Sequence, residues 1–267
     1  MNKLTNMFDS HCHFEDKLFG DKKESVLASL PQNGVAYIMN CCSDMEVVDD
    51  VLDIITRYDF AYGSLGVHPH WSCETPDGYL DTLRQKLDHP KIVALGEIGL
   101  DYWWPDDRKT QMRLFVEQMD LAQQLNLPVI IHARNKWEGT YPDALDDTLP
   151  VLKKYKLPGI VHRYCGGPKD LQTILDLGMY ISFNGDITYN EFNKNQLECI
   201  KVCPLDRILI ETDAPYMCPS QVGTPDDLSD PTMLPYIVEV ISRVRDIDPQ
   251  KICDITTNNA KNVYRIG

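Results

Sequence analysis

The sequence predicts an α/β protein whose fold is a (β/α)8 TIM barrel. Eight short apolar runs alternate with longer amphipathic stretches over all 267 residues, and each run has the length of a buried strand. A barrel of this kind typically has about 250 residues. A doubly wound sheet is the alternative, but no glycine-rich phosphate fingerprint follows the first run. We therefore expect residues 1–267 to form a single barrel domain.

The predicted strands are apolar runs, and most of these runs are rich in Val, Ile, Leu, Ala or Tyr. In chain order the strands are residues 7–14, 34–42, 60–68, 91–102, 128–134, 159–164, 179–185 and 207–215. The stretches between them have the apolar spacing of helices. In the stretch 108–126, the residues that recur at i+3 or i+4 are Met112, Phe115, Met119 and Ala122 or Gln123. Pro and Gly follow several of these stretches and indicate where helices stop.

Composition limits the function. The net charge of −14 excludes a broad basic face that wraps duplex DNA, but not a small site where metal ions supply the positive charge. No apolar run reaches the roughly 18 residues of a membrane span, and the N-terminal segment is too short and polar for a secretory signal. We expect a cytoplasmic protein, with the nucleus as the alternative location. The sequence indicates neither membrane association nor a stable protein partner.

The nine cysteines fit neither a disulfide framework nor a structural zinc site. Their number is odd, and no CxxC motif occurs. Cys199 and Cys203 share a helix face at i, i+4, but a second pair of thiols is missing beside them. We expect reduced thiols that fill space as small apolar residues.

The first candidate ligands lie in the stretch FDSHCHFED, residues 8–16. Strand side chains alternate between faces, so His11 and His13 both point toward the barrel mouth while Cys12 points toward the helices. Asp9 shares the face of the histidines, where it either orients them or has a structural role. By itself, this HxH stretch is compatible with a Cys/His zinc site, a redox thiol or two metal ligands.

Further polar residues stand at the ends of other predicted strands, where barrel active sites form. Glu97 lies inside an apolar run, where a carboxylate must be paired or bind a cation. Asp101 follows it as a loop hydrogen-bonding residue or a support for a ligand. Glu211 shares a strand face with Asp213 and is a candidate supporting carboxylate. The combined candidate ligand set is His11, His13, Glu97, His132, His162 and Asp213.

Six nitrogen and carboxylate ligands exceed what one hydrolytic zinc ion needs. They predict two divalent cations, with Glu97 as the bridging ligand. One cation is held by His11, His13 and Asp213, and the other by His132 and His162. Imidazole and carboxylate ligands suit Zn²⁺, Mn²⁺, Fe²⁺ or, less naturally, Mg²⁺.

These motifs resemble the TatD family of metal-dependent deoxyribonucleases, within the amidohydrolase-like barrels. The resemblance covers nearly the whole chain through MFDSHCHFE, GVHPH, ALGEIGLDYW, QMRLFVEQMDLAQQLNLPVIIHAR, GIVHRYCGG and ILIETDAPY. It implies that the six residues are metal ligands, that Asp213 and Glu97 are catalytic, and that the substrate is DNA. The implied activity is hydrolysis of DNA phosphodiester bonds, often from the 3′ ends of single strands, and the roles it suggests include DNA repair and DNA degradation during cell death.

The sequence departs from the family pattern near the expected substrate. Glu15 replaces an Asp or Asn, Lys136 replaces a small residue, and Arg163 with Tyr164 follows His162 in place of smaller residues. The segment 219–235 lacks the Arg-Asn-x-Pro that the family often has. The six ligands are unchanged, so these departures concern substrate contacts.

In the expected mechanism, two cations about 3.5–4 Å apart activate a water, and Asp213 accepts its proton. His68 and Arg134 are the predicted substrate-binding residues; an ion pair with a carboxylate is the alternative for Arg134. His70 and Arg163 are further candidates for contact with phosphate. Exposed aromatic residues after the third and fourth strands either stack on unpaired bases or pack under loops: Trp71, Trp103 and Trp104.

Two other classes of function remain as alternatives. A related metal-dependent hydrolase could act on an ester or amide such as D-aminoacyl-tRNA, which the atypical segment 219–235 keeps open. A binding protein on an inactive barrel is the third class, and the presence of all six ligands argues against it.

Overall fold

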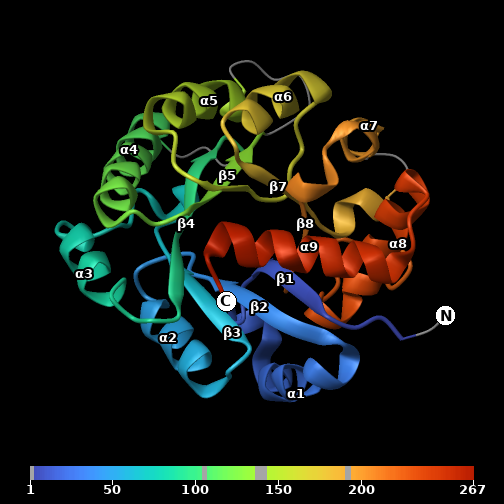
Figure 1. The fold of residues 1–267 in the computed structure, drawn as a ribbon. Coiled ribbons are helices and arrows are strands. Elements are labelled where there is room, and N and C mark those ends of the chain that lie inside the picture. Colours follow the sequence, from blue (N-terminus) through green and yellow to red (C-terminus); the bar gives the residue numbers. More distant parts are fainter. Residues whose placement is uncertain (1–2, 104–106, 136–142, 190–193) are drawn as a thin grey trace.

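The protein folds around eight parallel β-strands that follow one another in chain order (Figure 1). The computed structural model describes residues 3–103, 107–135, 143–189 and 194–267. Every predicted run contains one strand, which confirms the predicted (β/α)8 barrel. The strands are β1 (Met7–Cys12), β2 (Val35–Cys41), β3 (Ala61–Leu65), β4 (Ile92–Asp101), β5 (Val129–Arg134), β6 (Gly159–Val161), β7 (Tyr180–Phe183) and β8 (Ile208–Ile210).

The first and last strands meet at the ends that carry candidate ligands. Cys12 forms a parallel bridge with Ala214. The Asp213 N–H donates to the His11 carbonyl oxygen over 2.9 Å, and the His13 N–H donates to the Ala214 carbonyl oxygen over 2.7 Å. Closure of the barrel therefore depends on the backbone of the candidate ligands.

Helices surround the barrel and cover its outer face (Figure 1). They are α1 (Lys23–Ser29), α2 (Val48–Arg57), α3 (Tyr79–Lys86), α4 (Arg108–Leu125), α5 (Ala144–Tyr155), α6 (Pro168–Asp176), α7 (Lys194–Val202), α8 (Leu234–Arg245) and α9 (Pro249–Tyr264). In α4, Phe115, Met119 and Ala122 are buried while Gln123 is exposed, so the predicted apolar face continues through Ala122. Asp107 caps the start of this helix, and Asn126 ends it in a left-handed conformation.

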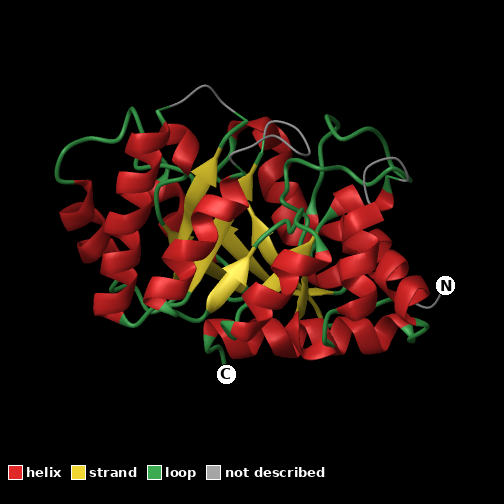
Figure 2. Ribbon diagram, turned by 90° about the horizontal axis from the view of Figure 1, so that it is seen from above, coloured by secondary structure: helices red, strands yellow, loops and turns green. Residues whose placement is uncertain are grey.

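One end of the barrel is closed by α9. In Figure 2 this helix lies at the end of the strands from which the arrows start, and the long loops lie at the other end. Tyr264 of α9 is fully buried against Phe8, with ring centroids 6.1 Å apart, and its hydroxyl donates to the Ser10 carbonyl oxygen over 3.0 Å. A ligand therefore enters from the carboxyl ends of the strands, as in other barrels of this type.

All nine cysteines are free thiols, as predicted. Cys12 is fully buried in the part of the core that packs the strands against the helices. Across the described ranges, the helices include none with the length and apolar character that a membrane span requires.

All eight strands are shorter than the predicted runs, and in β6 and β8 the difference affects candidate ligands. β6 ends at Val161 and β8 ends at Ile210, so His162 and Asp213 lie just beyond the strands rather than within them. Asp213 has a left-handed backbone with φ 59°, which a continuing strand could not provide. These turns leave the strand direction and place both side chains at the barrel mouth.

Candidate metal centre

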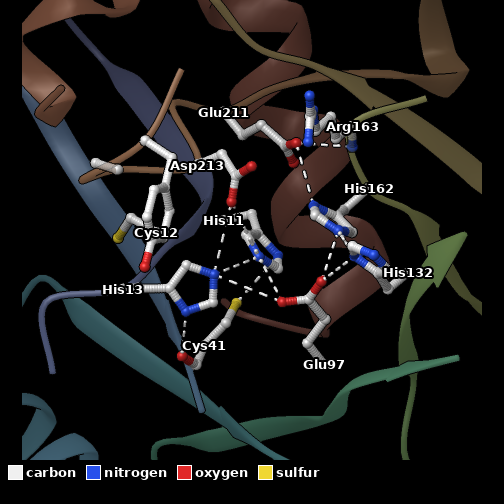
Figure 3. A network of polar contacts seen from close by, with 12 residues as sticks. His11, Cys12, His13, Cys41, Glu97, His132, His162, Arg163, Glu211 and Asp213 are labelled. Atoms are coloured by element: carbon white, nitrogen blue, oxygen red, sulfur yellow. Dashed lines mark hydrogen bonds and ion pairs between the residues drawn. The ribbon is translucent and has the colours of Figure 1, made fainter. Parts of the chain in front are cut away.

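The six candidate ligands come together at the mouth of the barrel (Figure 3). Each has a relative exposure of 7% or less. They come from β1, β4 and β5 and from the residues that follow β1, β6 and β8: His11, Glu97, His132, His13, His162 and Asp213.

Glu97 lies between two pairs of imidazoles. Its Oε2 is 3.2 Å from His11 Nε2 and 3.5 Å from His13 Nε2. Its Oε1 is 2.6 Å from His132 Nδ1 and 2.7 Å from His162 Nε2. Each oxygen of the carboxylate thus faces a different pair of nitrogen ligands, which is the arrangement a bridging ligand requires.

Asp213 completes the group around His11 and His13. Its Oδ1 is 3.8 Å from His11 Nε2 and 3.6 Å from His13 Nε2, and the two Nε2 atoms are 3.0 Å apart. The two histidines therefore share a face, as predicted. Cys12 between them directs its sulfur away from the two imidazoles (Figure 3) and lies 3.2 Å from the Met39 carbonyl oxygen.

The donor atoms are spaced closely enough to surround metal ions. Within the described residues, three groups have ligand atoms within 4.8 Å of one another: His11, His13 and Asp213; His11, Glu97 and His162; His68, Glu97 and His132. The first group is the first predicted ligand set. His132 and His162, the second predicted set, fall in separate groups that share Glu97. This buried nitrogen and carboxylate donor set fits divalent cations such as Zn²⁺ or Mn²⁺.

The pKa values of the buried side chains also fit a site for a cation. Burial opposes the charge of Glu97, but His162, His68, His11 and His132 together hold the pKa of its carboxyl well below the usual range. Burial lowers the pKa of His162, yet Glu97 and Glu211 outweigh it and raise this pKa to about 10. The carboxylates thus favour positive charge in the site, which a bound metal ion would supply.

Carboxylates outside the six ligands hold the imidazoles in place. Glu211 Oε1 lies 3.4 Å from His162 Nδ1, and Asp101 Oδ2 lies 3.1 Å from His132 Nε2. Both carboxylates are fully buried. Glu211 and Asp101 therefore both contact a candidate ligand, as expected for supporting carboxylates.

Two supporting residues were missed by the sequence reasoning. Glu15 Oε1 lies 3.0 Å from His13 Nδ1, and Cys41 Sγ lies 3.3 Å from His11 Nδ1. The signal for Glu15 was its place two residues after His13. Cys41 is the last residue of β2, and its place beside Cys42 in the sequence offers no ligand spacing that could identify it.

A pocket of about 350 Å³ opens over the ligands. It is lined by His13, Glu15, Asp16, Ser43, His68, His70, Trp71, Glu97, His132, Arg134, His162, Arg163, Asp213, Tyr216 and Met217. Among described residues, the segment 219–235 contributes nothing to this lining, so its unusual sequence does not shape the pocket wall directly.

The two predicted substrate-binding residues both line the pocket. His68 Nε2 is 3.6 Å from Glu97 Oε1, and its Nδ1 accepts a hydrogen bond from the His70 N–H over 3.0 Å. Arg134 forms an ion pair with Asp101, with Nη2 2.8 Å from Oδ2. The alternative considered for Arg134 is thus observed, and its contact with phosphate stays a prediction.

Exposed aromatic residues lie at and near the pocket. Trp71 is 38% exposed and Tyr216 is 41% exposed, and both line the pocket. Trp103 is 41% exposed beneath the Arg134 guanidinium, which lies 5.6 Å from its ring centroid. Tyr216 was not identified from the sequence, because ETDAPY drew attention only to its acidic residues. Trp104 and Lys136 lie outside the described residues.

Comparison with known proteins identifies the family. A family model for TatD related DNases matches residues 8–265. The chain belongs to the TatD family. It is 31% identical over 265 residues to the uncharacterized metal-dependent hydrolase YabD of Bacillus subtilis, an alignment that covers 98% of this chain and 100% of the relative. As a member of this family, the protein is a metal-dependent hydrolase, as predicted.

Another relative is a named nuclease. The 3′-5′ ssDNA/RNA exonuclease TatD of Salmonella typhimurium is 29% identical over 267 residues, with 97% of this chain and 99% of the relative covered. The crystal structure of the TatD homologue YjjV from Escherichia coli is similar with a TM-score of 0.87, at 29% identity over 98% of this chain and 99% of that chain. The TatD barrel is therefore shared over the full length.

Proposed function

We propose that this TatD-family protein is a metal-dependent deoxyribonuclease that acts as a 3′-5′ exonuclease on single-stranded DNA. The observation that carries the proposal is the position of Glu97, whose two oxygens face two separate pairs of imidazoles. Paired cations are the usual means of hydrolysing phosphodiester bonds, because they stabilise both the attacking and the leaving oxygen. The name of the Salmonella relative supports the same chemistry.

The six ligands would hold two divalent ions, of Mg²⁺, Mn²⁺ or Zn²⁺. His11, His13 and Asp213 would hold one, His132 and His162 the other, with Glu97 between them. When bound, the ions supply Lewis-acid chemistry and lower the pKa of water. Asp213 lines the pocket and would accept the proton of the attacking water. Its carboxyl is ionised at neutral pH, because His13, His162 and His11 outweigh burial and hold its pKa below the usual range.

Substrate contacts come from the pocket wall. Burial, together with nearby His132, lowers the pKa of His68 to about 3, so its imidazole is neutral at pH 7 and donates a hydrogen bond without charge. Arg134, the second predicted substrate-binding residue, lines the same wall. Trp71 and Tyr216 offer exposed rings on which unpaired bases stack, which favours single strands or 3′ ends in an acidic protein.

The alternative is a metal-dependent hydrolase that acts on an ester or amide, such as D-aminoacyl-tRNA. One observation favours it: Glu15 and Asp16 line the pocket beside His13. Two neighbouring carboxylates suit an ammonium group better than a phosphate. A cytoplasmic location, a role in DNA repair and the single-domain assignment of residues 1–267 remain predictions.

The direct test is cleavage of end-labelled DNA. Protein prepared with Mg²⁺, Mn²⁺ or Zn²⁺ is incubated with single-stranded and duplex oligonucleotides, and the products are resolved by length. We expect stepwise release of mononucleotides from 3′ ends of single strands, lost on chelation of the metal. Failure on every DNA substrate, together with turnover of an aminoacyl ester or amide, would reject the nuclease in favour of the alternative.

A further inference from the structure

Arg163 directly follows the candidate ligand His162, and its backbone is held in place by a hydrogen bond. It has a left-handed conformation with φ 42°, and its N–H donates to Glu211 Oε1 over 2.7 Å. The same oxygen lies 3.4 Å from His162 Nδ1. Figure 3 shows Arg163, Glu211 and His162 side by side on one flank of the centre. The Glu211 carboxylate, which positions His162, therefore also holds the backbone from which the Arg163 side chain extends.

The guanidinium of Arg163 is oriented by a second carboxylate. Its Nε donates to Asp186 Oδ2 over 2.8 Å, and the Asp186 N–H is bonded to Asn184 Oδ1 over 3.0 Å. Both charged side chains are 19% exposed, and Arg163 lines the pocket. Within the described residues, the hydrogen bonds of this side chain run through Nε alone. Both Nη groups have no hydrogen-bond partner in the described part of the chain and are available to a ligand.

Arg134, the other arginine of the pocket wall, is engaged differently. Its Nε lies 3.0 Å and its Nη2 2.8 Å from Asp101 Oδ2. That carboxylate also contacts His132 Nε2 at 3.1 Å. Arg134 thus neutralises the Asp101 carboxylate, which supports His132. Its Nε and Nη2 are already engaged in this contact.

The charges around the pocket favour Arg163 as an anion-binding residue. Its described lining includes four acidic residues but, besides the histidines, only two cationic ones: Glu15, Asp16, Glu97 and Asp213 against Arg134 and Arg163. A guanidinium with two unoccupied Nη groups matches two oxygens of one phosphate. Arg163 meets this requirement, and Arg134 does not.

We propose that Arg163 binds the phosphate group of the substrate at the metal centre and makes the pocket selective for phosphate esters over neutral esters. This inference rests on the proposed nuclease function. It moves the main cationic contact from Arg134 to Arg163, at a position where the sequence departs from the family pattern.

Equilibrium binding tests the proposal without turnover. Wild type, Arg163→Gln, Arg163→Lys and the surface control Arg113→Gln are loaded with Mn²⁺, and their metal content is measured. Thymidine 5′-monophosphate and uncharged thymidine are then titrated by calorimetry. We expect Arg163→Gln to weaken binding of the monophosphate by about 10- to 100-fold, the range for hydrogen bonds to a charged group. Arg163→Lys should restore part of that loss, and thymidine should respond equally in all four proteins.

Two results would overturn the proposal: an Arg163→Gln variant that binds the monophosphate as tightly as wild type at equal metal content, or a wild type that does not bind it. DNA cleavage by wild type is measured separately. Binding of the monophosphate that depends on Arg163, without cleavage of any DNA, would reject the nuclease function and leave the role of Arg163 intact.

Discussion

At the scale of single residues, Cys12 lies between two candidate ligands but belongs to the core. Its sulfur contacts the Met39 carbonyl oxygen, whereas His11 and His13 meet at their Nε2 atoms. We predict that Cys12→Ala keeps the metal content and activity of wild type, while His11→Ala loses most of both. Metal analysis of the purified variants by mass spectrometry checks this. Loss of metal in Cys12→Ala alone would show that the thiol, not the imidazoles, faces the centre.

Cys41 is expected to act through His11. Its sulfur lies 3.3 Å from the Nδ1 of that ring, on the side opposite the Nε2 that faces Glu97. Residues that orient a metal ligand typically contribute 10- to 100-fold to affinity, so we expect Cys41→Ala to weaken metal binding by about 10-fold. A chelator competition titration measures the change. The matched control is Cys253→Ala, a buried thiol on α9; equal effects of the two variants would indicate loss of packing only.

Metal binding should release protons. Glu97 and Glu211 outweigh burial and raise the pKa of His162 to about 10, and Glu15 and Asp213 likewise raise the pKa of His13. The His162 ring is therefore protonated at pH 8 in the metal-free protein, but a metal ligand must be neutral. Binding should release at least the His162 proton, and affinity should rise with pH up to about 10. Calorimetry in buffers of different ionisation enthalpy counts the protons; a count near zero contradicts the assignment.

At the scale of secondary-structure elements, α9 stabilises the barrel without taking part in the site. Tyr264 fills the closed end, and its hydroxyl donates to the Ser10 carbonyl oxygen over 3.0 Å. We predict that Tyr264→Phe lowers the free energy of unfolding by about 1 kcal/mol. Tyr264→Ala should lower it by about 3–5 kcal/mol because it leaves a cavity. Urea unfolding measures both, and unchanged metal stoichiometry in Tyr264→Phe is the control. A Tyr264→Ala variant as stable as wild type would contradict this packing role.

The order of the elements and the convergence of the candidate ligands were predictable for a physical reason. Buried parallel strands need continuous apolar runs, and a charged or imidazole side chain at the end of such a run stands out. Glu97 and His132 were found in this way. The turn into a left-handed conformation at Asp213 could not be foreseen, since it depends on hydrogen bonds with β1 that form only in the closed barrel.

Contacts between distant side chains were less predictable than the ligands. Arg134 had two possible partners in the sequence, phosphate or a carboxylate, and only the fold brings Asp101 within 2.8 Å of it. The contact of Cys41 with His11 joins two strands whose register includes a shift between Asp9 and Cys12. Alternation along an ideal strand does not anticipate such a shift. Supporting contacts of this kind depend on the three-dimensional arrangement.

At the scale of the whole molecule, the barrel separates stability from chemistry. The end closed by α9 carries apolar packing, while the end with the long loops gathers buried charge around Glu97 (Figures 2 and 3). Buried carboxylates and imidazoles are costly unless they are paired or bind a cation. Metal binding should therefore contribute to folding as well as to catalysis, because the unfolded chain has no preformed site.

The central claim is that Glu97 bridges two metal ions, and metal stoichiometry tests it most directly. Wild type, Glu97→Ala and the surface control Glu198→Ala are saturated with Zn²⁺, freed of excess ions and analysed by mass spectrometry. We predict about two ions per chain for wild type and Glu198→Ala, and at most about one, bound more weakly, for Glu97→Ala. Two tightly bound ions in Glu97→Ala would contradict the bridging role.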